Sequence, residues 1–363
     1  MIRASLAILA FAIWYLPYRH KTLFKLKKAW PWSLALFVPL AGYAVTLMTG
    51  FYTSPNLAAQ LMYNFFGLIF LGVIYLLPIT LLGHLLSSFL KPLASKKAGV
   101  AQLLLAFGLV AYGWLNAQNF KITKYEIELP GLKKPVTIAH IPDVHLGAQR
   151  GERYLNQMVK AINENAPDLV IYNGDLVDSD AALRPELFEL FRGVQAEQYF
   201  TTGNHEFYIS TQRALELIAG AGIRILRSQA AQTHGLEIIG LEYMNGDRFS
   251  TDMHRVNDLY MDEELPKIPR SGLPTVLFHH SPVGLAEPPK NEIKVMLTGH
   301  THGGQIFPVT WLIRYRFPYY KGPYELEGLT LLVSQGAGTF GPWARLGTFN
   351  ELQLVKLVPP KAS

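Results

Sequence analysis

Aspartate, asparagine and histidine recur in the second part of the chain, each shortly after a short apolar run. Five such runs lead into loops that contain these residues, namely Asp143 and His145, Asp175, Asn204 and His205, His280, and His300 and His302. Mixed carboxylate, imidazole and amide ligands suit divalent ions such as Mn, Fe or Zn. One carboxylate, for which we favour Asp175, can bridge two ions that clamp a phosphoryl oxygen and lower the pKa of a shared water. The residue types therefore predict phosphoester hydrolysis by a hydroxide that two metal ions activate.

Glycines accompany three of these loops. Gly174, Gly203 and Gly299 stand directly before Asp175, Asn204 and His300. A residue without a side chain permits a tight turn and a close approach of the backbone. We therefore expect crowded loops at these three places.

The runs before the loops have the composition of strands, and amphipathic stretches separate several of them. The strand-like runs include YEIEL (125–129), VTIAHI (136–141), DLVIYNG (168–174), QYFTTG (198–203), TVLFHH (275–280) and KVMLTG (294–299). Residues 151–165 and 181–195 read as helices. This alternation predicts an α/β sandwich with a β-rich second half. Open α/β sheets place their sites in loops at the carboxyl ends of strands, where these polar residues stand.

Five motifs occur in a characteristic order. They are D-x-H at Asp143 and His145, G-D-x-x-D at Gly174 to Asp178, G-N-H-E at Gly203 to Glu206, H-x-P at His280 to Pro282, and G-H-T-H-G-G-Q at Gly299 to Gln305. With this set, the stretch from residue 136 to residue 356 resembles the calcineurin-like metallophosphoesterase family. The resemblance implies a four-layer α/β/β/α sandwich. Together with the apolar segments that precede it, the chain is similar to the membrane-associated branch of YkuE-like and YaeI-like phosphodiesterases and of transmembrane proteins with a metallophosphoesterase domain.

The resemblance also implies a role for each motif residue. The implied metal ligands are Asp143, His145 and His302 for one ion, Asn204, His280 and His300 for the other, and Asp175 as the bridge. His205 would be catalytic, protonating the leaving oxygen or stabilising charge on the phosphoryl group. Asp178 would orient a ligand from behind. We interpret His140 and His279 as buried, hydrogen-bonded histidines rather than ligands.

Two further stretches near the C-terminus have more than one interpretation. The glycine-rich residues 334–342 suit either a phosphate cradle or a tight loop beside the active site, and they lack a Walker lysine. Arg345 suits either contact with a substrate phosphate or a plain surface position. The aromatic and basic residues 311–324 suit contact with lipid headgroups or substrate, and equally a packed hairpin.

The first third of the chain has a different composition. Four apolar segments precede residue 118, at residues 4–18, 31–50, 61–90 and 99–117. About 20 apolar residues suffice to cross a bilayer. We therefore predict an all-α transmembrane domain of about four helices over residues 1–120 and a metallophosphoesterase domain over residues 121–363. The chain has no cysteine, which excludes disulfides, zinc–thiolate sites and thiol nucleophiles.

Much of the net charge of +6 comes from two basic clusters beside the apolar segments. The loops at residues 19–28 and 91–98 hold these lysines and arginines, whereas residues 51–60 hold none. The positive-inside rule places the two basic loops in the cytoplasm, so four crossings would put both termini and the catalytic domain outside it. Since no basic stripe interleaved with aromatics occurs in the polar domain, we expect no nucleic-acid partner.

The sequence thus predicts a membrane-anchored, multi-pass phosphomonoesterase or phosphodiesterase that binds two divalent ions, with manganese among the candidates. Its expected partners are membrane lipids and a phosphoester substrate, and anchoring leads to the hypothesis of a lipid-linked one. The alternative is a membrane sensor or transporter-like protein with a regulatory metallophosphoesterase domain. That alternative requires ionisable residues facing each other within the apolar helices, and only His84 qualifies.

Overall fold

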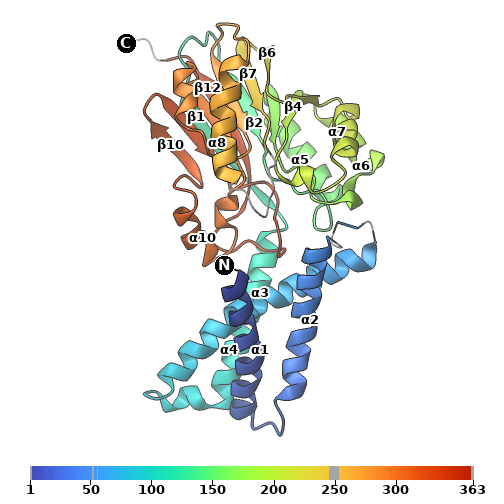
Figure 1. Ribbon diagram of the computed structural model, residues 1–363, viewed down its shortest axis with the longest axis vertical. Coiled ribbons are helices and arrows are strands. Elements are labelled where there is room, and N and C mark those ends of the chain that lie inside the picture. Colours follow the sequence, from blue (N-terminus) through green and yellow to red (C-terminus); the bar gives the residue numbers. More distant parts are fainter. Residues whose placement is uncertain (1, 51–52, 55, 245–252, 361–363) are drawn as a thin grey trace. The chain divides into compact units, whose positions relative to one another are not determined.

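The computed structural model describes residues 2–50, 53–54, 56–244 and 253–360 (Figure 1). The chain divides into two compact units. The first, here called the helical unit, consists of Met1–Asn116 and Gly341–Leu346. The second, here called the sheet unit, consists of Ala117–Phe340 and Gly347–Ser363. A short segment from the C-terminal loop therefore belongs with the N-terminal helices.

In the described part of the helical unit, four long helices are joined by loops that include the 3-10 turn η2 (Lys91–Ala94). The helices are α1 (Ile2–Phe24), α2 (Trp30–Thr49), α3 (Leu57–Leu86) and α4 (Lys96–Asn116). Among the residues that the structure describes, three helices are long and apolar enough to cross a membrane, namely α2, α3 and α4. The ends of α1 carry Arg3, Arg19 and Lys21, so its uncharged stretch is short, and its crossing stays a prediction.

The outer faces of these helices carry large apolar side chains. Met48 on α2 is 87% exposed, Phe107 on α4 is 72% exposed and Phe65 on α3 is 61% exposed. Such continuous apolar exposure is costly in water but suits hydrocarbon. Inside the unit, the Tyr15 hydroxyl lies 2.8 Å from His84 Nδ1, so the histidine of the apolar helix α3 has a local hydrogen-bonding partner. The sensor alternative, which requires ionisable residues facing each other within the apolar helices, stays an alternative prediction.

The main chain of segment Gly341–Leu346 forms hydrogen bonds with residues of α3 and α4. The Tyr63 hydroxyl donates to the Gly341 carbonyl at 3.1 Å. The Arg345 N–H donates to the Gly113 carbonyl at 2.8 Å, and Asn116 Nδ2 donates to the Arg345 carbonyl at 3.0 Å. A side chain at position 113 would meet Ala344 Cβ at 3.3 Å, so glycine there permits close packing.

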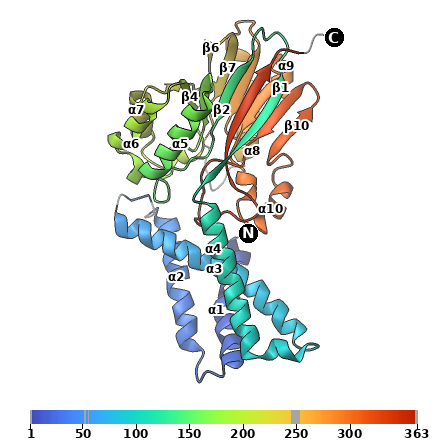
Figure 2. The ribbon, with the colours of Figure 1, turned by 180° about the vertical axis from the view of Figure 1, so that it is seen from behind.

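The sheet unit contains two six-stranded sheets (Figures 1 and 2). The first has the order β1 (Phe120–Glu128), β12 (Asn350–Val358), β2 (Val136–His140), β3 (Leu169–Asn173), β4 (Glu197–Thr201), β5 (Arg224–Ile225). The second has the order β10 (Gly322–Leu326), β11 (Leu329–Val333), β9 (Val295–Thr298), β8 (Thr275–His279), β7 (Leu236–Leu241), β6 (Gln229–Thr233). Strands β2 to β5 are parallel to one another, as are β7, β8, β9 and β11.

The two sheets pack face to face with helices outside them. Along β3, Leu169 and Ile171 join the cluster between the sheets, whereas Val170 and Tyr172 join the cluster under the outer helices. This follows from the two-residue period of a strand. Helices α5 (Glu152–Asn165), α6 (Pro185–Glu189) and α7 (Thr211–Gly220) cover the first sheet, and α8 (Met253–Glu264) covers the second. The expected α/β/β/α layer order is therefore confirmed.

One predicted element was wrong in detail. Residues 181–195, expected to form one helix, are divided into the 3-10 turn Asp180–Ala182, helix α6 and the 3-10 turn Leu190–Gly193. Pro185 begins α6, since proline has no N–H to donate to a preceding turn and suits only the first positions of a helix.

Candidate metal centre

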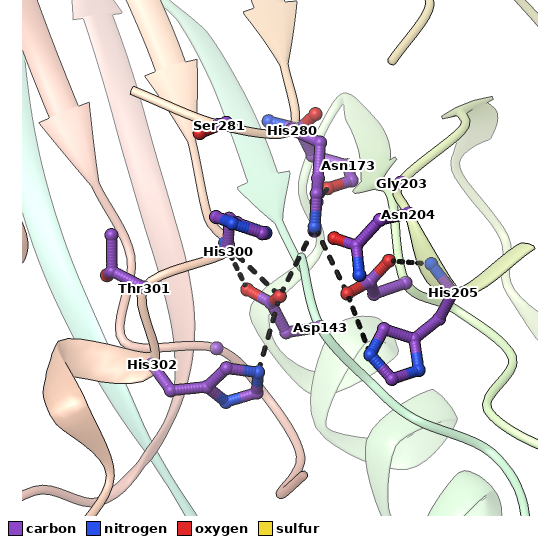
Figure 3. Close-up of polar contacts among 12 residues, drawn as sticks. Asp143, Asn173, Gly203, Asn204, His205, His280, Ser281, His300, Thr301 and His302 are labelled. Carbon is purple, nitrogen blue, oxygen red and sulfur yellow. Dashed lines mark hydrogen bonds and ion pairs between the residues drawn. The ribbon is translucent and has the colours of Figure 1, made fainter. Parts of the chain in front are cut away.

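The polar residues after five strands converge in the sheet unit (Figure 3). Strands β2, β3 and β4 lead to Asp143 and His145, Asp175, and Asn204 and His205, and strands β8 and β9 lead to His280, and to His300 and His302. The neighbouring parallel strands of each sheet end at one edge, which brings their loops together. Apart from the half-buried His300, all of these side chains are buried. The structure thus brings together all seven predicted ligands and His205.

One group of donor atoms comes from Asp143, His145 and His302. Their ligand atoms all lie within 4.8 Å of one another. His145 Nε2 is 3.1 Å from His302 Nε2, and His302 Nε2 is 3.5 Å from Asp143 Oδ1. Two imidazole nitrogens and a carboxylate oxygen that face one another in this way form a donor set suited to a divalent ion.

A second group comes from Asp175, His280 and His300, whose ligand atoms also lie within 4.8 Å of one another. His280 Nε2 is 3.1 Å from Asp175 Oδ2. Asp175 Oδ2 is also 3.8 Å from His145 Nε2, which belongs to the first group. Asp175 is therefore placed between the two groups.

One buried oxygen of the site, Asn204 Oδ1, makes no hydrogen bond with the residues that the structure describes. His280 Nε2 and His145 Nδ1 each face a carboxylate oxygen, of Asp175 at 3.1 Å and of Asp178 at 3.5 Å. Buried polar atoms in native proteins nearly always have a partner, because desolvation without one is costly. A cation coordinated by Asn204 Oδ1 would satisfy this atom, so the residues present fit a metal site.

The electrostatics of the cluster point to the same conclusion. Burial alone would lower the pKa of His280, but the Asp175 and Asp143 carboxylates outweigh it and raise that pKa to about 10. Burial alone would raise the pKa of Asp175, but the charges of His280, His205 and His145 hold it well below its usual value. A field that retains protons on buried imidazoles also attracts divalent cations, which compete with those protons for the same nitrogens.

His205 lies beside the cluster and contacts two of its carboxylates. Its main-chain N–H donates to Asp175 Oδ1 at 2.8 Å, and its ring Nδ1 forms a short hydrogen bond with Asp178 Oδ1. Burial lowers the pKa of His205, but Asp175 and Asp178 outweigh it and raise that pKa to about 9. Asp178 Oδ1 is also 3.5 Å from His145 Nδ1. Asp178 thus faces His205 as well as the predicted ligand His145.

The backbone of the ligand loops is unusual. Five predicted ligands have φ in the left-handed region, namely Asp143 (57°), His145 (52°), Asp175 (51°), His300 (69°) and His302 (50°). Non-glycine residues adopt this conformation rarely, and such outliers cluster at functional sites. Neighbouring glycines give the loops room, since a Cβ at Gly203 would lie 2.2 Å from Asp175 Oδ1 and one at Gly299 would lie 2.4 Å from Asp143 Oδ2.

Glu206 has a role that the sequence interpretation missed. Its buried carboxylate accepts hydrogen bonds from the main-chain N–H groups of Gly203 at 2.7 Å, Asp175 at 3.0 Å and Val177 at 3.1 Å. These bonds tie the loop after β3 to the loop after β4. The one available signal was its place in the G-N-H-E motif, directly after His205.

Asn173 was also missed. Its carbonyl accepts a hydrogen bond from His280 Nδ1 at 2.8 Å, which directs His280 Nε2 toward Asp175. Its side-chain Nδ2 donates to the Leu297 carbonyl at 2.8 Å and so joins the two sheets. His140 and His279 are fully buried and hydrogen-bonded, as expected.

The glycine-rich stretch borders the cluster. The Ala337 N–H donates to the Pro142 carbonyl at 2.9 Å, and the Gly338 N–H donates to the Asp143 carbonyl at 2.6 Å. The Phe340 ring lies 5.0 Å from the His205 ring and 6.1 Å from the His145 ring, measured between centroids. The interpretation as a tight loop beside the site is therefore confirmed.

Arg345 follows in the segment that belongs to the helical unit. Its side chain is fully buried, so the surface interpretation was wrong, and its contact with substrate stays a prediction.

Known proteins match a large part of this chain. The sequence pattern of the calcineurin-like phosphoesterase family matches residues 136–304, which hold all seven predicted ligands. An uncharacterized metallophosphoesterase of Aquifex aeolicus is 30% identical over 252 residues, covering 67% of this chain and 94% of that protein.

Two longer relatives match only in part. An uncharacterized metallophosphoesterase of Campylobacter jejuni is 30% identical, covering 65% of this chain and 63% of that protein. A zebrafish (Danio rerio) protein named transmembrane protein with metallophosphoesterase domain is 28% identical, covering 71% of this chain and 62% of that protein. The chain thus matches less than two thirds of the length of these two relatives. With the matched motifs, the two-sheet fold and the candidate ligand clusters taken together, this chain belongs to the calcineurin-like metallophosphoesterase family.

Proposed function

We propose that this protein is a membrane-anchored hydrolase of phosphoesters that works with two divalent ions. The observation that carries the proposal is the position of Asp175 between two groups of buried donor atoms. Bound there, two ions would activate a water molecule and neutralise charge on the phosphoryl group. Manganese, iron and zinc each suit the mixture of carboxylate, imidazole and amide donors.

The chain's own residues divide into three roles in this proposal. Asp143, His145 and His302 would hold the first ion, Asn204, His280 and His300 would hold the second, and Asp175 would be shared between them. His205, buried and held at Nδ1 by Asp178, keeps a proton that it donates to the leaving oxygen. Asn173 and Glu206 hold His280 and the ligand loops in position.

Hydrolysis of an aryl phosphodiester by the full chain in Mn²⁺ tests this assignment. We expect His205→Ala to reduce kcat by about 10²- to 10⁴-fold while retaining the metal, which is the range for a lost general acid. Asp175→Ala should lose both metal and turnover. His234→Ala, which alters a partly exposed histidine of the same unit, is the matched control. Undiminished turnover in both site variants would refute the catalytic assignment.

The proposal also includes a substrate class. An enzyme held at a bilayer by apolar helices meets phosphoesters attached to lipids at high local concentration. We therefore propose a lipid-linked phosphoester as the substrate. Equal kcat/KM for a lipid phosphodiester in vesicles and for its soluble analogue would count against this class.

A further inference from the structure

An exposed apolar patch lies on the sheet unit directly after the G-H-T-H-G-G-Q motif. It is formed around the short helix α10 (Val309–Leu312) and the 3-10 turn η8 (Ile313–Tyr315). We call it the α10 patch, and its members are Phe307, Val309, Trp311, Leu312 and Tyr315. Their exposed fractions run from 42% for Val309 to 73% for Tyr315. Contiguous exposure of large apolar side chains on a soluble face indicates an interaction surface.

We propose that the α10 patch inserts into the headgroup layer of a lipid bilayer and thereby presents the metal centre to phosphoesters that are attached to lipids. The second part of the proposal, presentation of the metal centre to lipid phosphoesters, rests on the proposed function. The first part, insertion into lipid, depends only on the chemistry of the patch and is tested separately.

The composition of the patch suits a bilayer surface. The Arg314 guanidinium lies over the ring of Trp311 at 4.9 Å and over the ring of Tyr315 at 5.3 Å. Tryptophan and tyrosine have an apolar body and a polar end, and arginine extends its charge past an apolar stem, so all three favour the interfacial layer.

The charge of the segment complements anionic headgroups. Residues 306–324 contain Arg314, Arg316 and Lys321 and no aspartate or glutamate. Basic residues close to an anionic membrane surface are attracted to it. Leu259 on α8 provides the contrast, because it is 58% exposed but stands between Asp258 and Asp262. Because its neighbours are acidic, the surroundings of Leu259 do not complement the negative charge of anionic headgroups.

The patch is joined closely to the metal ligands. A Cβ at Gly304 would lie 2.6 Å from Thr310 Cα, so α10 packs directly on the end of the histidine motif. The Phe317 ring, just after the patch, lies 5.6 Å from the His300 ring between centroids. The Gln305 side chain exchanges two hydrogen bonds with the main chain of Phe340, at 2.8 and 2.9 Å, and the Phe340 ring contacts His205. A lipid surface in contact with the patch would therefore be held near both ligand groups.

Site-directed spin labelling tests insertion without any catalysis. The chain has no cysteine, so Leu312→Cys and Leu259→Cys each give one labelling site in the full-length protein. The labelled protein is reconstituted in vesicles of phosphatidylcholine and phosphatidylglycerol, and the collision of the nitroxide with oxygen and with a water-soluble nickel chelate is measured. For each label we take the ratio of its collision rate with oxygen to its collision rate with the nickel chelate. Since oxygen concentrates in hydrocarbon, we expect this ratio to be at least about threefold higher at position 312 than at position 259.

Two results would overturn insertion. Equal access to the nickel chelate at both positions would show that the patch stays in water. Shielding of position 312 from both reagents would show that another protein, or a second copy of the chain, covers it. Neither result depends on whether the metal centre is active, so a failure here is distinct from a failure of the proposed function.

A pair of substrates with the same leaving group tests the delivery of lipid phosphoesters. Hexadecyl para-nitrophenyl phosphate in phosphatidylcholine vesicles is compared with water-soluble methyl para-nitrophenyl phosphate. The double variant Trp311→Ser/Leu312→Ser should lower the ratio of kcat/KM for the lipid to that for the soluble ester by about tenfold, a loss of about 1.4 kcal/mol in productive binding. The Leu259→Ser control should leave the ratio unchanged, and an unchanged ratio in the double variant would overturn delivery by the patch.

Discussion

At the scale of single residues, the ligand loops combine unfavourable backbone geometry with extensive support. Asp143, His145, Asp175, His300 and His302 all have positive φ, which costs of order 1–3 kcal/mol at each such position. The surrounding contacts keep this geometry, including the three main-chain bonds to Glu206 and the bond from His280 to the Asn173 carbonyl. The site is thus held in a binding-competent arrangement at a cost in stability.

The cost can be measured at His302, whose φ is 50°. Both His302→Gly and His302→Ala remove the ligand, but only glycine is unstrained at this φ. With metal chelated, we expect the glycine variant to be more stable than the alanine variant by about 1 kcal/mol. Unfolding in denaturant, followed by near-ultraviolet circular dichroism, measures the difference. An alanine variant that equals or exceeds the glycine variant would show that the backbone relaxes when the ligand is removed.

Asp178 is a positioning residue in this account, because it contacts His205 and His145 through Oδ1. Asp178→Asn keeps the shape but removes the charge that favours a proton on His205. We expect kcat to fall by about 10- to 100-fold, with metal content per chain unchanged. A fall in metal content parallel to the fall in kcat would assign Asp178 to ligand support instead.

At the scale of elements, the site depends on the ends of five strands, from two sheets, being held close together. The two sheets contribute ligands from β2, β3 and β4 on one side and from β8 and β9 on the other. Asn173 joins the sheets through its bond to the Leu297 carbonyl, and the His300 N–H donates to Asp143 Oδ2 at 2.9 Å across the same junction. The ligand loops of each sheet are therefore held partly by hydrogen bonds to residues of the other sheet.

Glu206 is the test of this arrangement, since it joins the loops after β3 and β4. In Glu206→Gln an NH₂ group takes the place of one carboxylate oxygen. Because this group donates hydrogen bonds, it cannot accept those that the oxygen accepted from the main-chain N–H groups. We expect the free energy of unfolding to fall by about 1–3 kcal/mol and the affinity for Mn²⁺ to weaken. Glu216→Gln, on the exposed face of α7, is the control. If Glu206→Gln matched the control in both quantities, the carboxylate would not hold these loops.

The sequence was sufficient for the parts of the fold that local patterns determine. The strands before Asp143, Asp175 and His280 are short apolar runs, and the polar residues after them follow from the same pattern. The roles of Glu206 and Asn173 depend on contacts between distant segments, which no local pattern records. Phe340 is a similar case, because its contact with His205 follows from the path of a loop more than a hundred residues later in the chain.

At the scale of the whole molecule, the chain combines a helical unit and a sheet unit. Segment Gly341–Leu346 belongs with the helices although the sheet unit surrounds it in sequence. Domain boundaries drawn from composition could not find this segment, since its residues resemble those of any glycine-rich loop. Composition also does not determine how many helices cross the membrane. Charged residues at both ends of α1 leave it an apolar stretch that is short for a crossing.

The sidedness of the sheet unit is a prediction from the charges of the loops. The basic loops at residues 19–28 and 91–98 predict four crossings with the catalytic unit outside the cytoplasm. A single exposed cysteine, Glu128→Cys, should react with a membrane-impermeant maleimide in intact cells, whereas Lys97→Cys should react only after lysis. The reverse pattern would place the catalytic unit in the cytoplasm, and reaction at both positions in intact cells would contradict the crossing count.

The most direct test of the central claim is electron paramagnetic resonance of the full chain during titration with Mn²⁺. The account predicts two ions per chain at saturation and an exchange-coupled spectrum, because Asp175 would bridge them. Asp175→Ala should abolish the coupling. A spectrum that shows only an isolated six-line Mn²⁺ signal at saturation, with one ion per chain, would contradict the two-metal site.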